Sequence, residues 1–260
     1  MMLPQLTSSL ILLLISSPNW NVQSKNVPVD WSTLIVGGVE AEKGEFPFMV
    51  GIRKASHHCG GSIINSEWIV SAAHCLTGDE SVYTVVAGDH INNEFEGTEQ
   101  NRTVTRIVIH PDYDLLTHES DIALVKISPP FVFNANVRPI SLAPNGFIPP
   151  SREVVVGWGR LAEGGNYANV LMKVEVPFVS DEDCKTAYGA DRITESMTCA
   201  GEEGKDACQA DSGGPLLCKV RNRQILCGVV SWGTGCARPD KPGIYAKVSY
   251  FESWISSVLK

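Results

Sequence analysis

Several features that define other classes of protein are missing or scarce in this sequence. Its eight cysteines include no C-x-x-C pair, which argues against a zinc site built from paired cysteines. Positive charge is scarce, because 21 Lys and Arg stand against 29 Asp and Glu and leave a net charge of −8. This balance argues against nucleic acid and anionic membrane as partners. Through residues 35–138 no long helical periodicity interrupts the short strand-like runs, which favours a β-sandwich or β-barrel.

The apolar run at residues 10–15 is too short to cross a bilayer. It is typical of a secretory signal peptide, although the positive charges that usually precede such a run are missing. We expect a signal peptide over residues 1–17, with its cleavage point unplaced, and a polar pro-segment over residues 18–34. The pro-segment contains no cysteine that could tether it after cleavage. An even number of cysteines fits an oxidising compartment, so we expect a secreted, extracellular protein.

The segment around Ser212 carries the first sign of catalysis. Two glycines and a proline follow this serine, so the chain turns tightly and presents the hydroxyl beside backbone N–H groups. A hydroxyl is a weak nucleophile until a base takes its proton, and that base needs a partner that orients it. Upstream, His74 in Ser-Ala-Ala-His-Cys and Asp121 in Asp-Ile-Ala-Leu are the candidate base and orienting carboxylate.

These segments, together with the Ile-Val-Gly-Gly sequence that begins at Ile35, resemble the trypsin/chymotrypsin family of serine proteases from Ile35 to Lys260. The resemblance implies an all-β fold of two antiparallel six-stranded β-barrels, with the active site between them and a C-terminal helix. We expect the barrels over residues 35–138 and 139–248 and the helix over residues 249–260. There, apolar residues recur at helical spacing, and Ser249 could cap the first turn.

The resemblance also implies roles in catalysis. His74 would be the general base and later the general acid, Asp121 would orient it, and Ser212 would be the acylating nucleophile. The backbone N–H groups of Ala210 and Ser212 would form the oxyanion hole. The family has glycine where Ala210 stands, so two functions remain open: a secreted endopeptidase, or a binding protein of low activity on the same fold.

Substrate specificity follows from residues that match the pocket of trypsin. Asp206 matches the acid at the pocket base, and Gly233 and Gly243 match its small walls, which implies a long cationic side chain in the substrate. Ala207 lacks a hydroxyl that many trypsins carry, which favours Arg over Lys because a guanidinium can bind a carboxylate bidentately. The segment Ser231-Trp232-Gly233 resembles the edge strand that pairs with the substrate backbone in the family. We expect protein or peptide substrates cut after Arg, then Lys, and protein protease inhibitors as partners.

Activation is expected to depend on a new N-terminus. In the family, the amine of the residue matching Ile35 pairs with the aspartate before the nucleophile, here Asp211. We therefore expect a monomeric zymogen that is cleaved between Leu34 and Ile35. Relatives commonly carry Arg or Lys where Leu34 stands, so activation would need an outside protease. A zymogen that is rarely activated is a further alternative.

An acid-rich segment over residues 89–99 resembles the calcium loop of trypsins. A structural calcium ion would take side-chain ligands from Asp89, Glu96 and Glu99 and carbonyl ligands from Ile91 and Glu94. Relatives with calcium have Glu where Asp89 stands, so a solvated acidic loop is the alternative. Catalysis should require no cofactor. The following Asn101-Arg102-Thr103 is an N-glycosylation acceptor.

Three disulfides are implied by the resemblance: Cys59–Cys75, Cys184–Cys199 and Cys208–Cys236. Relatives with a cysteine matching Cys218 often pair it with one at the position where Glu153 stands in this chain. Cys227 is the only cysteine left, and the strand-like segments around Asn222 predict a hairpin. We therefore expect Cys218 and Cys227 to form a cross-strand bridge that closes a short loop.

Overall fold

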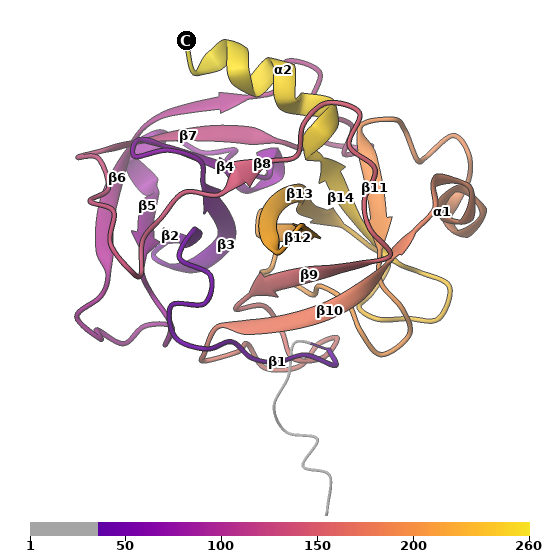
Figure 1. Cartoon of the computed structure of the whole chain (residues 1–260), viewed down its shortest axis with the longest axis horizontal. Coiled ribbons are helices and arrows are strands. Elements are labelled where there is room, and N and C mark those ends of the chain that lie inside the picture. Colours follow the sequence, from indigo (N-terminus) through magenta and orange to yellow (C-terminus); the bar gives the residue numbers. More distant parts are fainter. Residues whose placement is uncertain (1–35) are drawn as a thin grey trace, which may run out of the picture. The chain divides into compact units, whose positions relative to one another are not determined.

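The computed structural model describes residues 36–260 of the chain (Figure 1). The expected signal peptide, the pro-segment, Leu34 and Ile35 therefore lie outside the described residues. Within them, two β-barrels follow one another along the sequence, and the C-terminal helix comes last.

The first barrel, drawn from indigo to magenta in Figure 1, closes through six antiparallel strands in the order β2-β3-β4-β7-β6-β5. Val, Ile and Thr are frequent in these strands, and their branched side chains suit a pleated sheet. β4 is buried along its whole length. The strands are β2 (Met49–Lys54), β3 (Ser56–Ile63), β4 (Trp68–Ser71), β5 (Thr84–Ala87), β6 (Gln100–Ile109) and β7 (Ala123–Ser128).

The second barrel also closes through six antiparallel strands, because β9 pairs with both β10 and β12 around the ring β9-β10-β11-β14-β13-β12. Two short strands extend it: β1 (Val39–Glu40) pairs with β10, and β8 (Ser141–Leu142) pairs in parallel with β13. The ring consists of β9 (Arg152–Gly157), β10 (Met172–Val179), β11 (Met197–Ala200), β12 (Pro215–Val220), β13 (Arg223–Trp232) and β14 (Gly243–Lys247). The predicted fold class is confirmed.

The predicted hairpin around Asn222 is formed by β12 and β13, with Val220 opposite Arg223. Arg221 and Asn222 make the two-residue turn with φ of +46° and +63°, the left-handed pair that suits the twist of antiparallel strands. Cys218 and Cys227 are bridged across this hairpin. The structure also contains the Cys59–Cys75, Cys184–Cys199 and Cys208–Cys236 bridges, and no described cysteine is free.

Two α-helices complete the described chain. The C-terminal helix α2 (Val248–Val258) buries Phe251 and Ile255, as the apolar spacing predicts. The prediction that Ser249 caps it is wrong: the N-cap position is Lys247, and Ser249 lies inside the first turn. The helix α1 (Asp181–Tyr188) was not predicted, although Ser180 caps it by accepting a hydrogen bond from the backbone N–H of Asp183.

The two barrels share one hydrophobic core cluster, which holds residues of both barrels and of α2. A backbone hydrogen bond also joins them, from Gly60 on β3 to the carbonyl of Ser212, at 2.8 Å. Because this contact reaches the predicted nucleophile itself, packing between the barrels decides where Ser212 stands relative to residues of the first barrel.

Candidate active site

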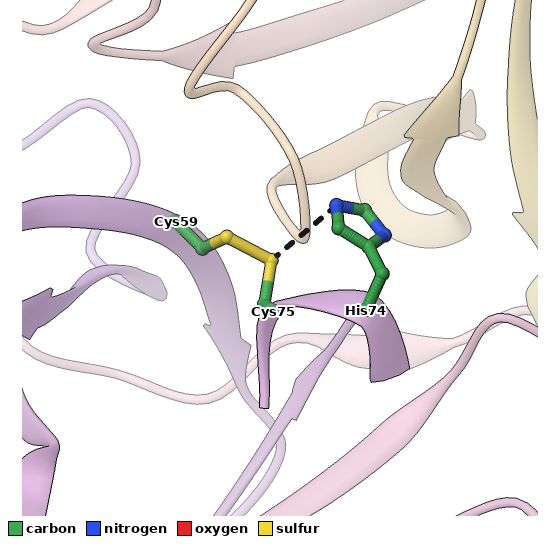
Figure 2. Close-up of side chains that lie close together, drawn as sticks. All are labelled: Cys59, His74 and Cys75. Carbon is green, nitrogen blue, oxygen red and sulfur yellow. Dashed lines mark hydrogen bonds between the residues drawn. A yellow bond between two sulfur atoms is a disulfide. The ribbon is translucent and has the colours of Figure 1, made fainter. Parts of the chain in front are cut away.

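His74 lies on the short 3-10 helix η1 (Ala73–Cys75), which follows β4. The Cys59–Cys75 disulfide ties the next residue to β3, and Figure 2 shows the imidazole beside this bridge, with Nε2 3.7 Å from Cys75 Sγ. The other ring nitrogen, Nδ1, lies 2.7 Å from Asp121 Oδ2. The disulfide restrains the turn, and the carboxylate sets which ring nitrogen carries the proton.

Asp121 is only 1% exposed and comes just before β7. Its Oδ1 accepts the backbone N–H of His74 at 2.9 Å, and its Oδ2 accepts the hydroxyl of Ser231 at 2.5 Å. Burial favours the neutral acid, but the imidazoles of His118 and His74 and the Ser231 hydroxyl hold the pKa of Asp121 well below its usual range. Ser231 belongs to β13, so both barrels contribute to keeping this carboxylate ionised.

Ser212 is carried by a tight turn of the second barrel, in which the N–H of Gly214 donates to the carbonyl of Asp211 at 2.8 Å. Gly213 has φ of +78°, and a Cβ there would lie 2.2 Å from Ser71 Oγ. Only glycine therefore lets this turn pack against the segment that leads to His74.

Within residues 36–260, no hydrogen bond joins Ser212 Oγ to His74 Nε2. Hydrogen bonds between a nucleophile and its base are often long in the free enzyme and tighten when substrate binds. The turn that carries Ser212 therefore packs against the segment that leads to His74, while the described residues show no hydrogen bond between the two side chains.

Ala210, two residues before Ser212, has φ of +72°. The left-handed conformation costs a residue with a Cβ about 1–2 kcal/mol, and glycine adopts it freely. Alanine thus takes the conformation here at an energetic cost, and the backbone keeps its N–H group.

A pocket of about 210 Å³ opens beside Ser212. A Cβ on Gly243 would come within 2.6 Å of Asp206 Oδ1, whereas one on Gly233 would meet no atom closer than 3.9 Å. The absence of side chains at these positions keeps the pocket open in front of Asp206. Its lining includes all the residues predicted to recognise substrate: Asp206, Ala207, Ser231, Trp232, Gly233 and Gly243.

Asp206 is only 3% exposed. The N–H of Ala237 donates to its Oδ2 at 3.0 Å, but its Oδ1 has no hydrogen-bond partner in the described part of the chain. Burial raises the pKa of Asp206 to about 7, although backbone N–H groups of Ala237 and Ala207 oppose the rise. The hydroxyl of Tyr245, which lines the same pocket, is also buried without a partner. The pocket therefore contains polar groups that could form hydrogen bonds with a ligand.

Asp211 is fully buried next to Ser212. Backbone N–H groups of Gly159 and Cys208 donate to its two carboxylate oxygens at 2.8 and 3.0 Å, and burial raises its pKa to about 6. Its predicted partner, the amine of Ile35, lies outside the described residues. The first described residue, Val36, accepts a hydrogen bond from the N–H of Asp206 at 3.4 Å.

Comparison with known proteins agrees with this geometry. A family model described as Trypsin matches residues 35–255. This chain belongs to the trypsin family of serine proteases. It is 46% identical to Trypsin-1 of Astacus astacus over 86% of this chain and 99% of that protein. It is also 43% identical to Serine protease 1 of Rattus norvegicus and 40% identical to Anionic trypsin of Canis lupus familiaris, each over 89% of this chain and 92% of the relative.

Membership of the trypsin family makes the chain a serine endopeptidase, a hydrolase that acts on protein substrates and is open to protein inhibitors. Its catalysis needs no cofactor. The alternative of a binding protein without catalysis is therefore not supported. Among residues 36–260 there is no helix with the length and apolar character needed to cross a membrane.

The acidic loop of this trypsin-family chain gathers the three predicted side-chain ligands. Carboxylate oxygens of Asp89, Glu96 and Glu99 lie within 4.8 Å of one another. Asp89 Oδ1 is buried without a hydrogen-bond partner in the described chain, and burial raises the pKa of Asp89 to about 6 although Arg53 opposes the rise. The arrangement suits a cation.

Two side chains already bring positive charge to this loop. Arg53 contacts Asp89 Oδ2 at 2.5 Å, and Lys43 contacts Glu96 Oε1 at 2.8 Å. The carbonyl of Ile91, a predicted ligand, accepts the N–H of Glu94 at 3.1 Å. A calcium ion would therefore compete with both basic residues. The side chain of Asn101 is exposed on β6.

Two residues at the site were not predicted from the sequence. Tyr245 lies in β14, and its hydroxyl reaches the pocket only because β14 pairs with β13. His118 places Nδ1 3.8 Å from Asp121 Oδ2 and stacks its ring on Trp232. The available signal was a second histidine three positions before the predicted Asp121.

Proposed function

We propose that this enzyme cleaves peptide bonds after Arg and, less efficiently, after Lys. The observation that carries the proposal is that Asp206 Oδ1, in the pocket beside Ser212, has no hydrogen-bond partner among residues 36–260. A guanidinium would supply the missing donors, whereas an apolar side chain would leave a polar group buried and unpaired, at about 1–3 kcal/mol. Ala207 offers no side-chain hydroxyl to a lysine ammonium, so the preference for Arg follows from the bidentate geometry of the guanidinium.

The proposed chemistry proceeds in two halves. Ser212 Oγ attacks the carbonyl carbon of the scissile bond while His74 Nε2 takes its proton, and His74 then gives that proton to the leaving amine. The acyl group remains as an ester on Ser212. A water molecule, deprotonated by His74, attacks the carbonyl carbon of this ester. The bond to Ser212 Oγ then breaks, the acid is released, and His74 gives the proton to Ser212 Oγ.

Two features of the site would lower the energy of these steps. Asp121, which is held ionised, keeps the proton on His74 Nδ1 and stabilises the imidazolium that forms when Nε2 is protonated. The N–H groups of Ala210 and Ser212 would donate to the oxyanion. The loss of one such donor costs about 10²–10³ in kcat, so the left-handed backbone at Ala210 matters for the rate.

Activation is proposed to follow secretion as a monomer. Residues 1–17 would be removed as a signal peptide, and cleavage between Leu34 and Ile35 would then remove the pro-segment of residues 18–34. The freed amine of Ile35 would give the buried Asp211, whose pKa is raised by burial, a cationic partner. An apolar Leu34 would not suit the Asp206 pocket, so the activating protease would be one that cleaves after apolar residues.

We also propose that the acidic loop binds calcium as a structural ion and that Asn101 carries a glycan. Three carboxylates and the buried, unpaired Oδ1 of Asp89 fit the oxygen chemistry of calcium, while Arg53 and Lys43 would weaken binding. Calcium at millimolar concentration should raise the thermal midpoint, because an ion that binds only the native state stabilises it. An unchanged midpoint would leave a solvated acidic loop.

Burst titration of the protein that starts at Ile35 tests the central proposal. An arginine ester should give one acyl-enzyme burst per active site, and esters with Phe or Leu at the cleaved position should react far more slowly. A preference for Phe or Leu would refute the role of Asp206.

Activation is tested separately on the zymogen. Trypsin should leave the zymogen inactive, and Leu34→Arg should make it activatable by trypsin. If the active natural protein starts at a residue other than Ile35, the proposed activation route is refuted.

A further inference from the structure

A second imidazole lies beside the catalytic pair. His118 Nδ1 is 3.8 Å from Asp121 Oδ2, and the ring stands edge-on to that of His74, with centroids 5.8 Å apart. Its Nδ1 is buried and has no hydrogen-bond partner within the described chain. The chemistry of peptide hydrolysis set out above does not use this nitrogen.

The loop before Asp121 holds His118 in place. The carboxylate of Asp114 accepts the N–H groups of Leu116 and Thr117 at 2.9 and 2.8 Å, and the N–H of Asp114 donates to the carbonyl of Glu119 at 3.1 Å. The ring of His118 stacks on Trp232 at an interplanar angle of 23°. The imidazole is therefore oriented by the loop on one side and by the second barrel on the other.

The three side chains form a donor set for a transition metal. One ligand atom from each of His74, His118 and Asp121 lies within 4.8 Å of the other two. Two imidazoles and one carboxylate are a ligand combination that zinc uses in proteins, with bonds of about 2.0–2.2 Å and hence ligand atoms about 3.4 Å apart. The separation of 3.8 Å between His118 Nδ1 and Asp121 Oδ2 is already near this value.

We propose that His74, His118 and Asp121 bind a zinc ion reversibly and that the bound ion switches the protease off. The proposal rests on the roles of His74 and Asp121 given under the proposed function. Zinc would take the place of the proton between His74 Nδ1 and Asp121 Oδ2, which are now 2.7 Å apart, and the imidazole, which stays neutral, would carry its proton on Nε2 instead. With Nδ1 bound to the metal and Nε2 protonated, His74 could no longer accept the proton of Ser212.

Access to the site from solvent is uneven in a way that suits a reversible ligand. The side chains of His74 and His118 are 21% and 31% exposed, whereas that of Asp121 is 1% exposed. An ion would therefore meet the two imidazoles first and could keep water in the fourth position of a tetrahedron. Calcium and magnesium prefer oxygen ligands and should not compete at this site.

The test compares three proteins with the N-terminus at Ile35: the wild type, His118→Gln and His58→Gln. His58→Gln is the matched control, because it also removes one imidazole, which contacts the carbonyl of Cys75 and lies outside the donor set. Zinc chloride is titrated into each protein while hydrolysis of an arginine ester is followed and normalised to the rate without zinc. Calorimetry with zinc alone, and cobalt absorption spectra, measure binding without reference to activity.

Zinc should inhibit the wild type and the control equally, EDTA should restore activity, and His118→Gln should weaken both inhibition and binding by about tenfold or more. Cobalt should give the intense visible absorption bands of a tetrahedral site in the wild type. These bands should be much weaker in His118→Gln. Equal inhibition of wild type and His118→Gln, or no binding to the wild type, would overturn the proposal. A protein that binds zinc through His118 but shows no hydrolysis without zinc would support this site and refute the proposed function instead.

Discussion

Asp121 beside the first barrel and Asp206 in the second are equally hidden from water, at 1% and 3% exposure, yet their surroundings differ. Asp121 receives hydrogen bonds from the His74 backbone, the His74 ring and Ser231, and its pKa is held well below the usual range. Asp206 receives its bonds at Oδ2 from the backbone, keeps Oδ1 unpaired, and has its pKa raised to about 7.

The difference teaches that burial alone does not decide the charge of a carboxylate. A carboxylate whose partners come from the protein is ready before substrate arrives, and its negative charge can be used on an imidazolium. A carboxylate with one unpaired oxygen is destabilising in the free protein and gains its partner from the substrate. Under the proposed function, the same residue type would serve catalysis beside one barrel and substrate recognition in the other.

The largest expected effect comes from Asp121→Asn, which removes the charge but keeps the shape. The amide would favour the wrong tautomer of His74, so kcat for an arginine ester should fall about 10⁴-fold, the loss known for this exchange in the serine protease template. KM should change little. Steady-state kinetics checks both values, and Ser231→Ala is a milder control because it removes one hydrogen bond to Asp121. A fall in kcat of less than tenfold for Asp121→Asn would contradict the role of Asp121.

Asp206→Asn is the matched exchange in the second barrel, and it should separate activity from stability. Loss of the charge should lower kcat/KM for an arginine ester by at least about a hundredfold, because the cation loses its charged partner. The thermal midpoint should rise, since the substitution removes a buried carboxylate that has one oxygen without a partner in the described chain. Asp121→Asn should lower the midpoint, because it disturbs a satisfied set of hydrogen bonds. Midpoints that move in the same direction would contradict the comparison.

Glu153 extends the comparison to a carboxyl outside the active site. It is 1% exposed, its Oε2 has no partner in the described chain, and burial raises its pKa to about 8. The folded state therefore keeps a proton that the unfolded state releases near pH 4.5, so stability is lost as pH rises from about 4.5 towards 8. Glu153→Gln should therefore raise the free energy of unfolding at pH 8 by an amount on the order of a few kcal/mol. Urea unfolding of the wild type and Glu153→Gln at pH 5 and pH 8 measures this change. If the two proteins differ in free energy of unfolding by the same amount at both pH values, the prediction is refuted.

Ala210→Gly should have the smallest effect. The left-handed backbone is already present at Ala210, so the N–H of this residue need not be repositioned and kcat should change by less than about tenfold. The relief of left-handed strain and the greater freedom of glycine in the unfolded chain should largely cancel in stability. Single-turnover kinetics and thermal unfolding check both. A hundredfold gain in kcat would show that alanine had cost the enzyme an oxyanion donor.

Much of the fold could be predicted from local features of the sequence. Short strands were expected through residues 35–138, and Trp68–Ser71 is one of them. The strands expected on both sides of Asn222 are β12 and β13, which form the predicted hairpin. The helix α1 was missed because it is short, and its signal was one Ser-x-x-Asp cap inside a polar segment. Ser249 was wrongly placed as a cap because the helix begins one residue earlier, after Lys247.

By itself, the sequence determined the chemical groups and the turns that carry them, because Gly213, the Cys75 bridge and the segments around His74 and Asp121 act over a few neighbouring residues. Only the tertiary structure decided which groups would be paired. Ser231 donates to Asp121 across 110 positions of sequence, while Asp206 Oδ1 and His118 Nδ1 have no hydrogen-bond partner in the described chain. Desolvation and hydrogen bonding at these atoms depend on how strands and loops distant in sequence pack together, and no local pattern in the chain specifies that packing.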